Sequence, residues 1–282
     1  MSSQTTSASV ESGAMQSHWT LDSIHWSALR RDRVAHDDAL FYLIAGASFV
    51  EATTDLYTQN LIEYFAHDDE ITTWLRNHWL PEELQHGQAL RRYVRLTWPD
   101  FDWDSVYARF QPEFAAQCAE DGVEPTYTRE MASRCVVEMG TSSYYRTLSR
   151  MTDEPVLCEL ARRISDDEVR HYKHFYRYLR KYQRREGQRR RGIALATFNR
   201  LRMIGGADSR IAMRHIYCER NRGGVLDDRM LRSMRQHWRP MIQAHFPHRM
   251  CVQMLLKPLG LGPRAHRLAV PVLEAVARRV VP

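Results

Sequence analysis

The sequence lacks the features that mark several common classes of protein. Its five cysteines are odd in number and widely spaced, and none forms a CxxC pair, which excludes a disulfide framework and predicts reduced thiols in the cytoplasm. No window approaches the roughly 20 apolar residues of a membrane-spanning helix, so we expect no transmembrane segment. Sustained alternation of apolar and polar residues is also missing, which argues against a β-sheet. With 44% hydrophobic residues, the chain still has enough apolar side chains for a packed core.

Lysine is scarce, and the basic charge is unevenly distributed. Only three of the 40 basic residues are Lys. Residues 1–187 hold 21 Lys+Arg and 29 Asp+Glu, whereas residues 188–282 hold 19 and 5, so the net charges are −8 and +14. A genome that favours Arg over Lys explains the choice of residue but not the excess of charge. The second segment therefore predicts attraction to a polyanion, either an acidic protein, nucleic acid or anionic lipid. Because no nucleic-acid recognition motif accompanies the charge, we expect no nucleic-acid partner.

Helical periodicity dominates the remainder, so we expect an all-α fold. Four long helical patterns contain apolar residues at intervals of three and four, and Pro81 is expected to kink the second or to begin a new helix there. The four long patterns cover residues 36–65, 67–98, 126–151 and 155–185, with a shorter helix at 106–119. Beyond the boundary GQRRRG, five shorter patterns cover 193–204, 208–220, 225–243, 245–256 and 266–280.

These patterns predict three parts of the chain. Residues 1–34 begin with a Ser/Thr-rich stretch and are expected to form a disordered tail and lead-in. Residues 35–186 form a four-helix bundle, and residues 187–282 form a basic helical region packed on the bundle or extending it.

Two Glu-x-x-His pairs lie inside the long helices. They are Glu83/His86 in PEELQHGQAL and Glu168/His171 in SDDEVRHYKHF. A chain with 17 Glu and 13 His contains roughly one such pair by chance, so either pair alone would indicate only a solvated helix face. Residues i and i+3 of a helix share a face, so each pair can direct a carboxylate and an imidazole at one point.

Two further glutamates complete a repeated pattern. Glu51 precedes Glu83 by nearly the same interval as Glu138 precedes Glu168, so the chain repeats a unit of one Glu followed by one Glu-x-x-His. Glu51 and Glu138 both interrupt otherwise apolar or small-residue helix faces, so we expect them to be buried. A two-metal centre in a four-helix bundle uses one Glu from each of two helices and one Glu-x-x-His from each of the other two. The repeat therefore predicts six metal ligands: Glu51, Glu83, His86, Glu138, Glu168 and His171.

The chemistry of this set favours a particular kind of metal. Four converging buried carboxylates would be severely destabilising without cations to offset their charge. Mixed carboxylate and imidazole ligation with open positions suits iron that reacts with dioxygen, with manganese as the alternative. The acids beside the ligand glutamates, Glu82 and Asp167, are expected to orient the ligand histidines through hydrogen bonds. Other polar groups on these helices are expected to be surface, packing or neighbouring groups: Asp55, Glu63, Glu130, Tyr144, Tyr145, Tyr172 and His174.

Over residues 35–185 the sequence resembles the soluble acyl-carrier-protein desaturases, a branch of the ferritin-like di-iron superfamily. The segments that carry the resemblance are FVEATTDLY, WLPEELQHGQALRRYV, CVVEMGTSSYYRTL and ISDDEVRHYKHF. The resemblance implies a ferritin-like bundle with two iron ions held by the six ligands, O2 as co-substrate, and Thr141 at the dioxygen-binding side of the centre. It also implies an oxidase or desaturase that removes hydrogen from an unactivated C–H bond of an acyl chain on a carrier protein.

The resemblance leaves partners and substrate to be decided. It implies an acidic acyl carrier protein, a ferredoxin-type electron donor and a homodimer. For electron delivery the family uses an N-terminal Trp that we could not match, although Trp19 and Trp26 are available. The basic segment is a plausible docking surface, and its first candidates are Arg184, Arg185, Arg189, Arg190 and Arg191. The alternatives are a di-iron hydroxylase or N-oxygenase of a small metabolite and a non-enzymatic ferritin-like iron-binding protein.

Overall fold

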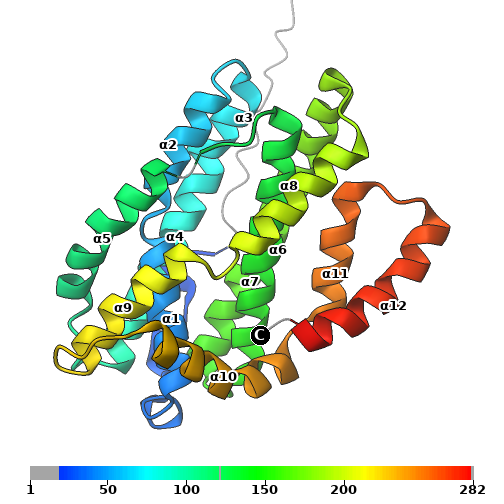
Figure 1. Cartoon of the computed structure of the whole chain (residues 1–282). Helices are drawn as coiled ribbons and strands as arrows, with labels where there is room; N and C mark the ends of the chain where they lie inside the picture. The colour runs from blue at the N-terminus through cyan, green and yellow to red at the C-terminus, as the bar shows by residue number, and fades with distance from the viewer. Residues whose placement is uncertain (1–18, 121, 281–282) are drawn as a thin grey trace, which may run out of the picture.

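The computed structural model describes residues 19–120 and 122–280, so most of the expected tail lies outside the described residues. Within the described residues the regular structure is entirely helical, which confirms the all-α prediction. The long helices follow from the apolar periodicity of the sequence (Figure 1). Their bounds are α1 (Asp38–Glu51), α2 (Thr54–Tyr64), α3 (Asp69–Trp74), α4 (Leu80–Thr97), α5 (Trp103–Glu120), α6 (Tyr127–Met151), α7 (Pro155–Glu186), α8 (Arg190–Met203), α9 (Ala207–Arg220), α10 (Asp228–His245), α11 (His248–Leu256) and α12 (Pro263–Val280).

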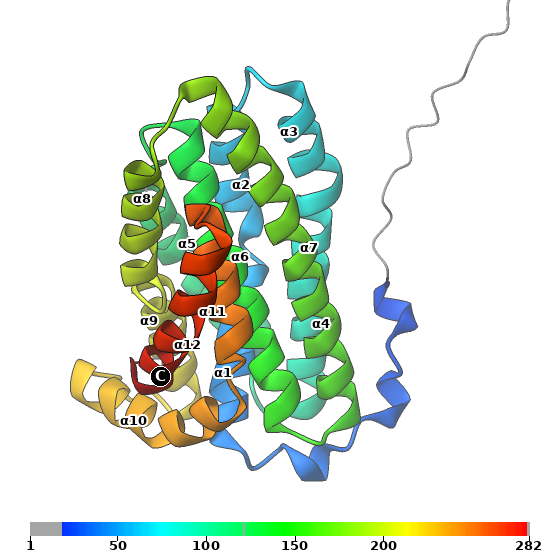
Figure 2. The ribbon, with the colours of Figure 1, turned by 90° about the vertical axis from the view of Figure 1, so that its right-hand side faces the viewer.

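The bundle consists of four rods that run side by side. α6 and α7 pack closely along their length, α1 packs on α4, and α4 also contacts α7 (Figures 1 and 2). α2 continues the rod begun by α1, and α3 continues the rod that contains α4. Two clusters of buried apolar and aromatic side chains fill the space between the rods. This arrangement brings the middles of all four rods together inside the molecule.

The first rod is not the continuous helix that the pattern over 36–65 predicts. It breaks at residues 52–53, and α1 and α2 meet at an angle of 41°. At the break the Thr53 hydroxyl donates to the carbonyls of Phe49 (3.1 Å) and Val50 (2.8 Å). Such bonds between side chain and backbone compete with helical hydrogen bonding and bend helices. The break leaves Glu51 as the last residue of α1.

The second rod changes its helical geometry just before Pro81. Residues Leu75–Trp79 form a π-helical segment between α3 and α4, and α4 then begins at Leu80 with Pro81 in its first turn. Proline has no backbone N–H, so a first-turn position is where a helix tolerates it. The backbone stays helical from α3 into α4, so the interruption predicted at Pro81 takes the form of the π-helical segment just before it, and Glu82 and Glu83 follow in the same turn as Pro81.

The lead-in before α1 is folded where the structure describes it. Residues 19–34 contain three short 3-10 turns and bury the side chains of Trp19, Ile24 and Val34. The backbone N–H of Arg30 donates to Glu154 Oε1 (3.0 Å) at the start of α7. The expected tail therefore does not extend through the lead-in, which runs along the outside of the bundle. The three turns are Leu21–Ser23, Trp26–Ala28 and Arg31–Arg33.

The basic region wraps the bundle rather than forming a separate layer. α8, α10 and α11 each contact α6, and α9 packs on α5 and α1. α12 packs on α11, after a short 3-10 turn at Lys257–Leu259, and lies on the outside of the molecule (Figure 2). No single described helix is long and apolar enough to cross a membrane. The bent pair α1 and α2 has, as a pair, the length and the apolar composition of a membrane span.

Candidate metal centre

The six side chains that the repeat singles out converge between the four rods. α1 supplies Glu51, α4 supplies Glu83 and His86, α6 supplies Glu138, and α7 supplies the remaining pair. None of the six residues is more than 6% exposed. Six ionisable groups buried in one place are unfavourable unless something compensates their charge.

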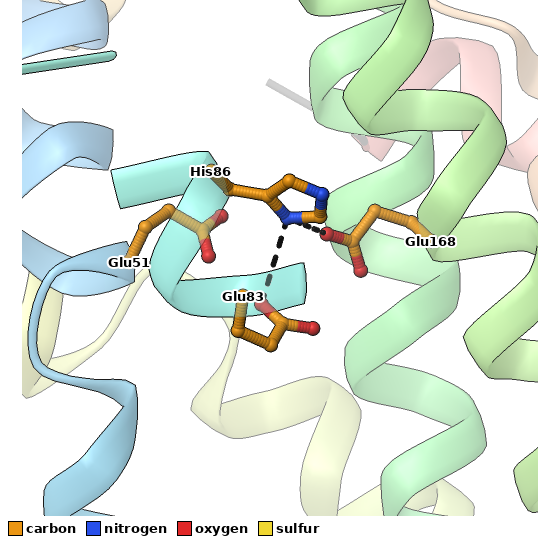
Figure 3. Close-up of side chains that lie close together, drawn as sticks. All are labelled: Glu51, Glu83, His86 and Glu168. Atoms are coloured by element: carbon orange, nitrogen blue, oxygen red, sulfur yellow. Dashed lines mark ion pairs between the residues drawn. The ribbon is translucent and has the colours of Figure 1, made fainter. Parts of the chain in front are cut away.

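These side chains form two groups that share members. In each group the potential ligand atoms all lie within 4.8 Å of one another. Glu83 and Glu168 belong to both groups, as two carboxylates that bridge a pair of ions would. Figure 3 shows the first group, with Glu51, Glu83 and Glu168 arranged around the His86 ring. The first group is Glu51, Glu83, His86 and Glu168, and the second is Glu83, Glu138, Glu168 and His171.

Each histidine directs one ring nitrogen into the cluster. His86 Nδ1 lies 3.3 Å from Glu168 Oε1 and 3.8 Å from Glu83 Oε2. His171 Nδ1 lies 3.0 Å from Glu83 Oε1 and 3.7 Å from an oxygen of Glu138. The two Nδ1 atoms are therefore the atoms available for metal coordination.

The outward nitrogen of each histidine bonds to an acid on the opposite helix. His86 Nε2 donates to Asp167 Oδ2 at 3.0 Å, and His171 Nε2 donates to Glu82 Oε2 at 2.8 Å. Arg170 connects the two acids, because it donates to Asp167 Oδ1 (2.5 Å) and to Glu82 Oε2 (3.2 Å). When the imidazoles are neutral, as metal binding requires, this network favours the tautomer in which Nδ1 carries a lone pair toward the cluster.

The nitrogen and oxygen atoms that point into the cluster are better suited to bind metal ions than to form hydrogen bonds with one another. His86 Nδ1, His171 Nδ1, both carboxylate oxygens of Glu138 and Glu168 Oε1 are buried and have no hydrogen-bond partner in the described part of the chain. Buried polar atoms without partners are rare and costly in folded proteins. Four carboxylates and two imidazoles form a hard donor set of the kind that binds iron or manganese. The residues present therefore fit a pair of divalent or trivalent cations.

Burial and the neighbouring charges shift the pKa values of these groups in the metal-free protein. Burial, assisted by the charges of Glu83 and Glu168, raises the pKa of Glu51 well above its usual value. Burial and Glu168 do the same to the pKa of Glu138. Burial acts to lower the pKa of His86, but Asp167, Glu168 and Glu83 around the ring hold it well above the usual value. In the metal-free state the site therefore retains protons that metal binding must displace.

Trp19 is a member of the network that the sequence pattern did not single out over Trp26. Its indole Nε1 donates to Asp167 Oδ2 at 2.7 Å, the oxygen that also accepts from His86. The Trp19 and His86 rings stack with centroids 6.1 Å apart and an interplanar angle of 6°. A Trp in the lead-in was the sequence feature that could have identified this contact, but the lead-in contains two tryptophans. Trp26 instead donates to the carbonyl of Leu21.

Two hydroxyl groups contact the carboxylates directly. Thr141 Oγ1 donates to Glu168 Oε2 at 2.9 Å, one turn beyond Glu138 on α6. Tyr145 Oη donates to Glu51 Oε1 at 2.5 Å, which is more than the packing role expected for this tyrosine. Each group thus contains a carboxylate oriented by a neighbouring hydroxyl of α6.

The other polar residues considered in the sequence lie outside both groups. Asp55 and Glu63 are exposed on α2, and Glu130 is buried but pairs with Arg134 at 2.8 Å. His174 stacks on Trp74 with centroids 4.8 Å apart. The remaining tyrosines bond to backbone carbonyls: Tyr144 to Leu43 and Tyr172 to Met254.

Gly87 allows α4 to approach the break between α1 and α2. A Cβ atom at this position would lie 2.7 Å from the backbone nitrogen of Ala52 and 2.9 Å from the carbonyl carbon of Glu51. Gly87→Ala is therefore expected to push Glu51 away from His86 and to cost about 1–3 kcal/mol of folding free energy. The measurements are thermal unfolding and bound metal.

Gly46→Ala is the matched control for this prediction. Gly46 lies inside α1, and nothing lies within 4 Å of a Cβ placed there. This variant is expected to be neutral or to stabilise by about 0.5–1 kcal/mol. Equal unfolding temperatures for the two variants would contradict the close approach.

Comparison with known proteins agrees with this geometry. The family model described as "Fatty acid desaturase" matches residues 5–197, which is more than half of the chain and spans every residue of the centre. The chain belongs to the fatty acid desaturase family.

The chain is also similar to part of two curated proteins. The chain is 30% identical over 117 residues to the "Putative acyl-[acyl-carrier-protein] desaturase DesA2" of two Mycobacterium tuberculosis strains, CDC 1551 / Oshkosh and ATCC 25618 / H37Rv. The matched segment is 42% of this chain and 41% of each relative, so the chain spans less than half the length of the relatives that it matches. The region that the family model matches contains every residue of the buried cluster that could hold metal ions.

Proposed function

We propose that the chain is an O2-dependent di-iron oxidase or desaturase that removes hydrogen from an unactivated C–H bond of an acyl chain bound to a carrier protein. The observation that carries the proposal is the pair of four-residue groups sharing Glu83 and Glu168. Membership of the fatty acid desaturase family supports the substrate class, and the name of the Mycobacterium tuberculosis relatives supports the carrier. Two bound iron ions would supply the capacity to reduce dioxygen and to oxidise a C–H bond.

The residues of the chain have separable tasks in this proposal. Glu83 and Glu168, which belong to both groups, would contribute to holding either ion, whereas His86 with Glu51 and His171 with Glu138 would each help to hold one. Asp167 and Glu82 hold the imidazoles in the coordinating tautomer. Burial of the six groups keeps bulk water away from the reacting atoms.

The contact between Trp19, Asp167 and His86 offers a route for electrons from an external donor. Trp19 lies in the lead-in at the outside of the bundle, and one carboxylate oxygen of Asp167 accepts from both the indole and the imidazole. This continuous hydrogen-bonded line ends at a proposed ligand. We propose that electrons from an external donor, of the ferredoxin type that the family resemblance implies, enter the centre along this line.

We propose that the hydroxyl of Thr141 places a proton beside Glu168 and that its contact with this carboxylate keeps water away. Thr141→Val keeps the volume of the side chain and removes the hydrogen bond to Glu168 Oε2. Because hydrogen bonds to charged groups contribute about 1.5–3 kcal/mol, product formation is expected to fall about tenfold to a hundredfold while both metals remain bound. Turnover and metal content are measured together, with Thr141→Ser as the control that restores the hydroxyl. A Thr141→Val enzyme with unchanged turnover would contradict this role.

Docking of an acidic carrier is proposed at the turn between α7 and α8. The five arginines singled out from the sequence, here called the arginine turn, are all exposed: Arg184, Arg185, Arg189, Arg190 and Arg191. Arg185 lies 3.6 Å from Asp68, and the other four form no ion pair within the described residues. Arg189→Glu with Arg190→Glu is expected to raise KM for an acyl carrier substrate about tenfold without changing kcat. The control is Arg229→Glu, an exposed arginine on α10. Equal KM values for both variants would remove the arginine turn from the docking surface.

The function itself is tested by turnover of defined substrates. Iron-loaded protein, a ferredoxin and its reductase, O2 and acyl carrier substrates are incubated, and products are identified by mass spectrometry. An alkene formed from the acyl chain is the expected product. Oxidation of a small metabolite in preference to acyl carriers would contradict the substrate class. Iron mineral formation with O2 consumption and no organic product would contradict an oxidase altogether.

A further inference from the structure

α12 exposes an apolar stripe on the side that faces away from the protein. Leu268, Val272 and Val276 follow one another at intervals of four residues and are 73%, 63% and 47% exposed. The opposite side of α12 buries Val270 and Ala277, which join a small apolar cluster on α11. Figure 2 shows α12 on the outer surface of the molecule, carried by α11. Large apolar side chains gathered on a free helix face indicate an interaction site.

Arginines border this stripe. α12 contains four arginines and one acid, and the acid, Glu274, is neutralised by an ion pair with Arg278 at 2.7 Å. Arg264 precedes Leu268 by one turn, and Arg279 follows Val276 by three residues, so both lie at the ends of the stripe. Arg239 of α10 donates to the carbonyl of Arg279 at 2.5 Å, so another cation lies beside the helix. The surroundings of the stripe therefore carry net positive charge.

A cavity lies between α11 and α12, on the side of α12 that carries the buried Val270. Its volume is about 290 Å³. Arg267 and Pro271 line it, and they are the immediate neighbours of Leu268 and Val272 in the sequence. The other lining residues are Arg249, Gln253, His266, Val270 and Glu274. Arg249 and Arg267 of this lining add to the positive charge around α12, and Glu274 offsets part of it.

We propose that α12 binds the surface of an anionic phospholipid bilayer. An interfacial helix places its apolar face at the boundary of headgroups and acyl chains, and its flanking arginines contact the lipid phosphates. The exposed stripe and the arginines at its ends meet these requirements on a single helix. A second copy of the chain fits less well, because pairing two such stripes would bring eight arginines of the two helices together. The chain would lie on the membrane without crossing it.

Vesicle flotation of the full chain tests this proposal. The expected result is binding to vesicles of phosphatidylcholine mixed with phosphatidylglycerol, and much weaker binding to phosphatidylcholine alone. Leu268→Glu with Val272→Glu is expected to reduce binding more than about tenfold. Arg264→Gln with Arg267→Gln is expected to reduce it about fivefold for each arginine. All substituted side chains are exposed, so unchanged thermal unfolding and metal content confirm that the variants remain folded.

Val225→Glu is the matched control, because Val225 is a highly exposed apolar residue in the loop before α10. This variant is expected to bind vesicles like the original chain. Failure of the original chain to bind anionic vesicles would overturn the proposal, as would full binding by the Leu268→Glu/Val272→Glu variant. Two further outcomes would overturn the proposal if vesicles are not bound. One is a dimer of the original chain, detected by sedimentation, that the Leu268→Glu/Val272→Glu variant no longer forms. The other is an acidic carrier protein that the original chain captures and this variant does not.

Discussion

Replacing Glu168 with glutamine is expected to prevent stable loading of both metal positions. Glu168 belongs to both four-residue groups, lies 3.3 Å from His86 Nδ1 and accepts from Thr141. Glutamine keeps the size of the side chain but removes the negative charge and one metal-binding oxygen, so each position loses a ligand at once. Glu138→Gln alters the second group alone, and it is expected to leave the first position loaded. Bound metal per chain, measured by elemental analysis after removal of free ions, distinguishes the two variants.

Glu130→Gln is the matched control for this pair. Like Glu138, Glu130 is a buried glutamate of α6, but it pairs with Arg134 and lies in neither group. The variant is expected to lose some stability and to bind as much metal as the original chain. A Glu168→Gln protein that still binds two metals would show that the shared carboxylate does not bridge them. Equal losses from Glu138→Gln and Glu168→Gln would show that the two positions do not fill separately.

Removing the metals is expected to make stability fall as the pH rises. The pKa values of Glu51 and Glu138 are raised well above 4.5 by burial and neighbouring carboxylates, and the carboxylates around His86 and His171 hold their pKa values well above 6.5. The folded metal-free protein therefore binds protons that the unfolded chain has already released at neutral pH. Each such proton lowers the free energy of unfolding by about 1.4 kcal/mol per unit of pH increase.

The pH window follows from the direction of each shift. The two glutamates begin to reduce stability once the pH passes 4.5, and the two histidines once it passes 6.5, in both cases until the raised pKa of the folded state is reached. Glu83 and Glu168 act in the opposite direction at acid pH, because the nearby His171 and His86 outweigh the effect of burial and leave their pKa values below 4.5. Metal-free protein is therefore expected to be most stable in mildly acid solution.

Urea unfolding of chelator-treated and metal-loaded protein between about pH 6 and pH 8 measures this effect. In loaded protein the ligands are already deprotonated and metal binding releases protons, so the stabilisation by metal is expected to grow with pH. A metal-free protein whose stability is constant over this range would contradict the ionisation described for the centre. A constant difference between the two preparations would contradict the coupling of protons to metal.

The clustering of the six residues could be predicted from the sequence because a repeated pattern is less often a coincidence than a single motif. Neither Glu-x-x-His pair was significant alone, but each followed a glutamate of an apolar helix face at nearly the same interval. Helical periodicity then put both members of each pair on one face. The structure brings all six together, and Asp167 and Glu82 form hydrogen bonds with His86 and His171, whereas metal ligation by the six residues stays a prediction.

The features that sequence reasoning missed depend on contacts between distant segments. The break after Glu51 arises where Thr53 bonds to preceding carbonyls and where Gly87 of α4 packs against the backbone. Local helix propensity does not report such contacts. Trp19 is far from Asp167 in the sequence, so no periodic pattern distinguishes it from Trp26. The π-helical segment before Pro81 also has no simple sequence signature, although the proline itself indicated the start of α4.

Crystallographic anomalous scattering at the iron absorption edge, on protein loaded with iron, tests the central claim most directly. The account predicts two peaks in each chain. One should lie among Glu51, Glu83, His86 and Glu168, and the other among Glu83, Glu138, Glu168 and His171. A single peak, or peaks bound by other residues while these six remain unliganded, would contradict a two-metal centre in this bundle.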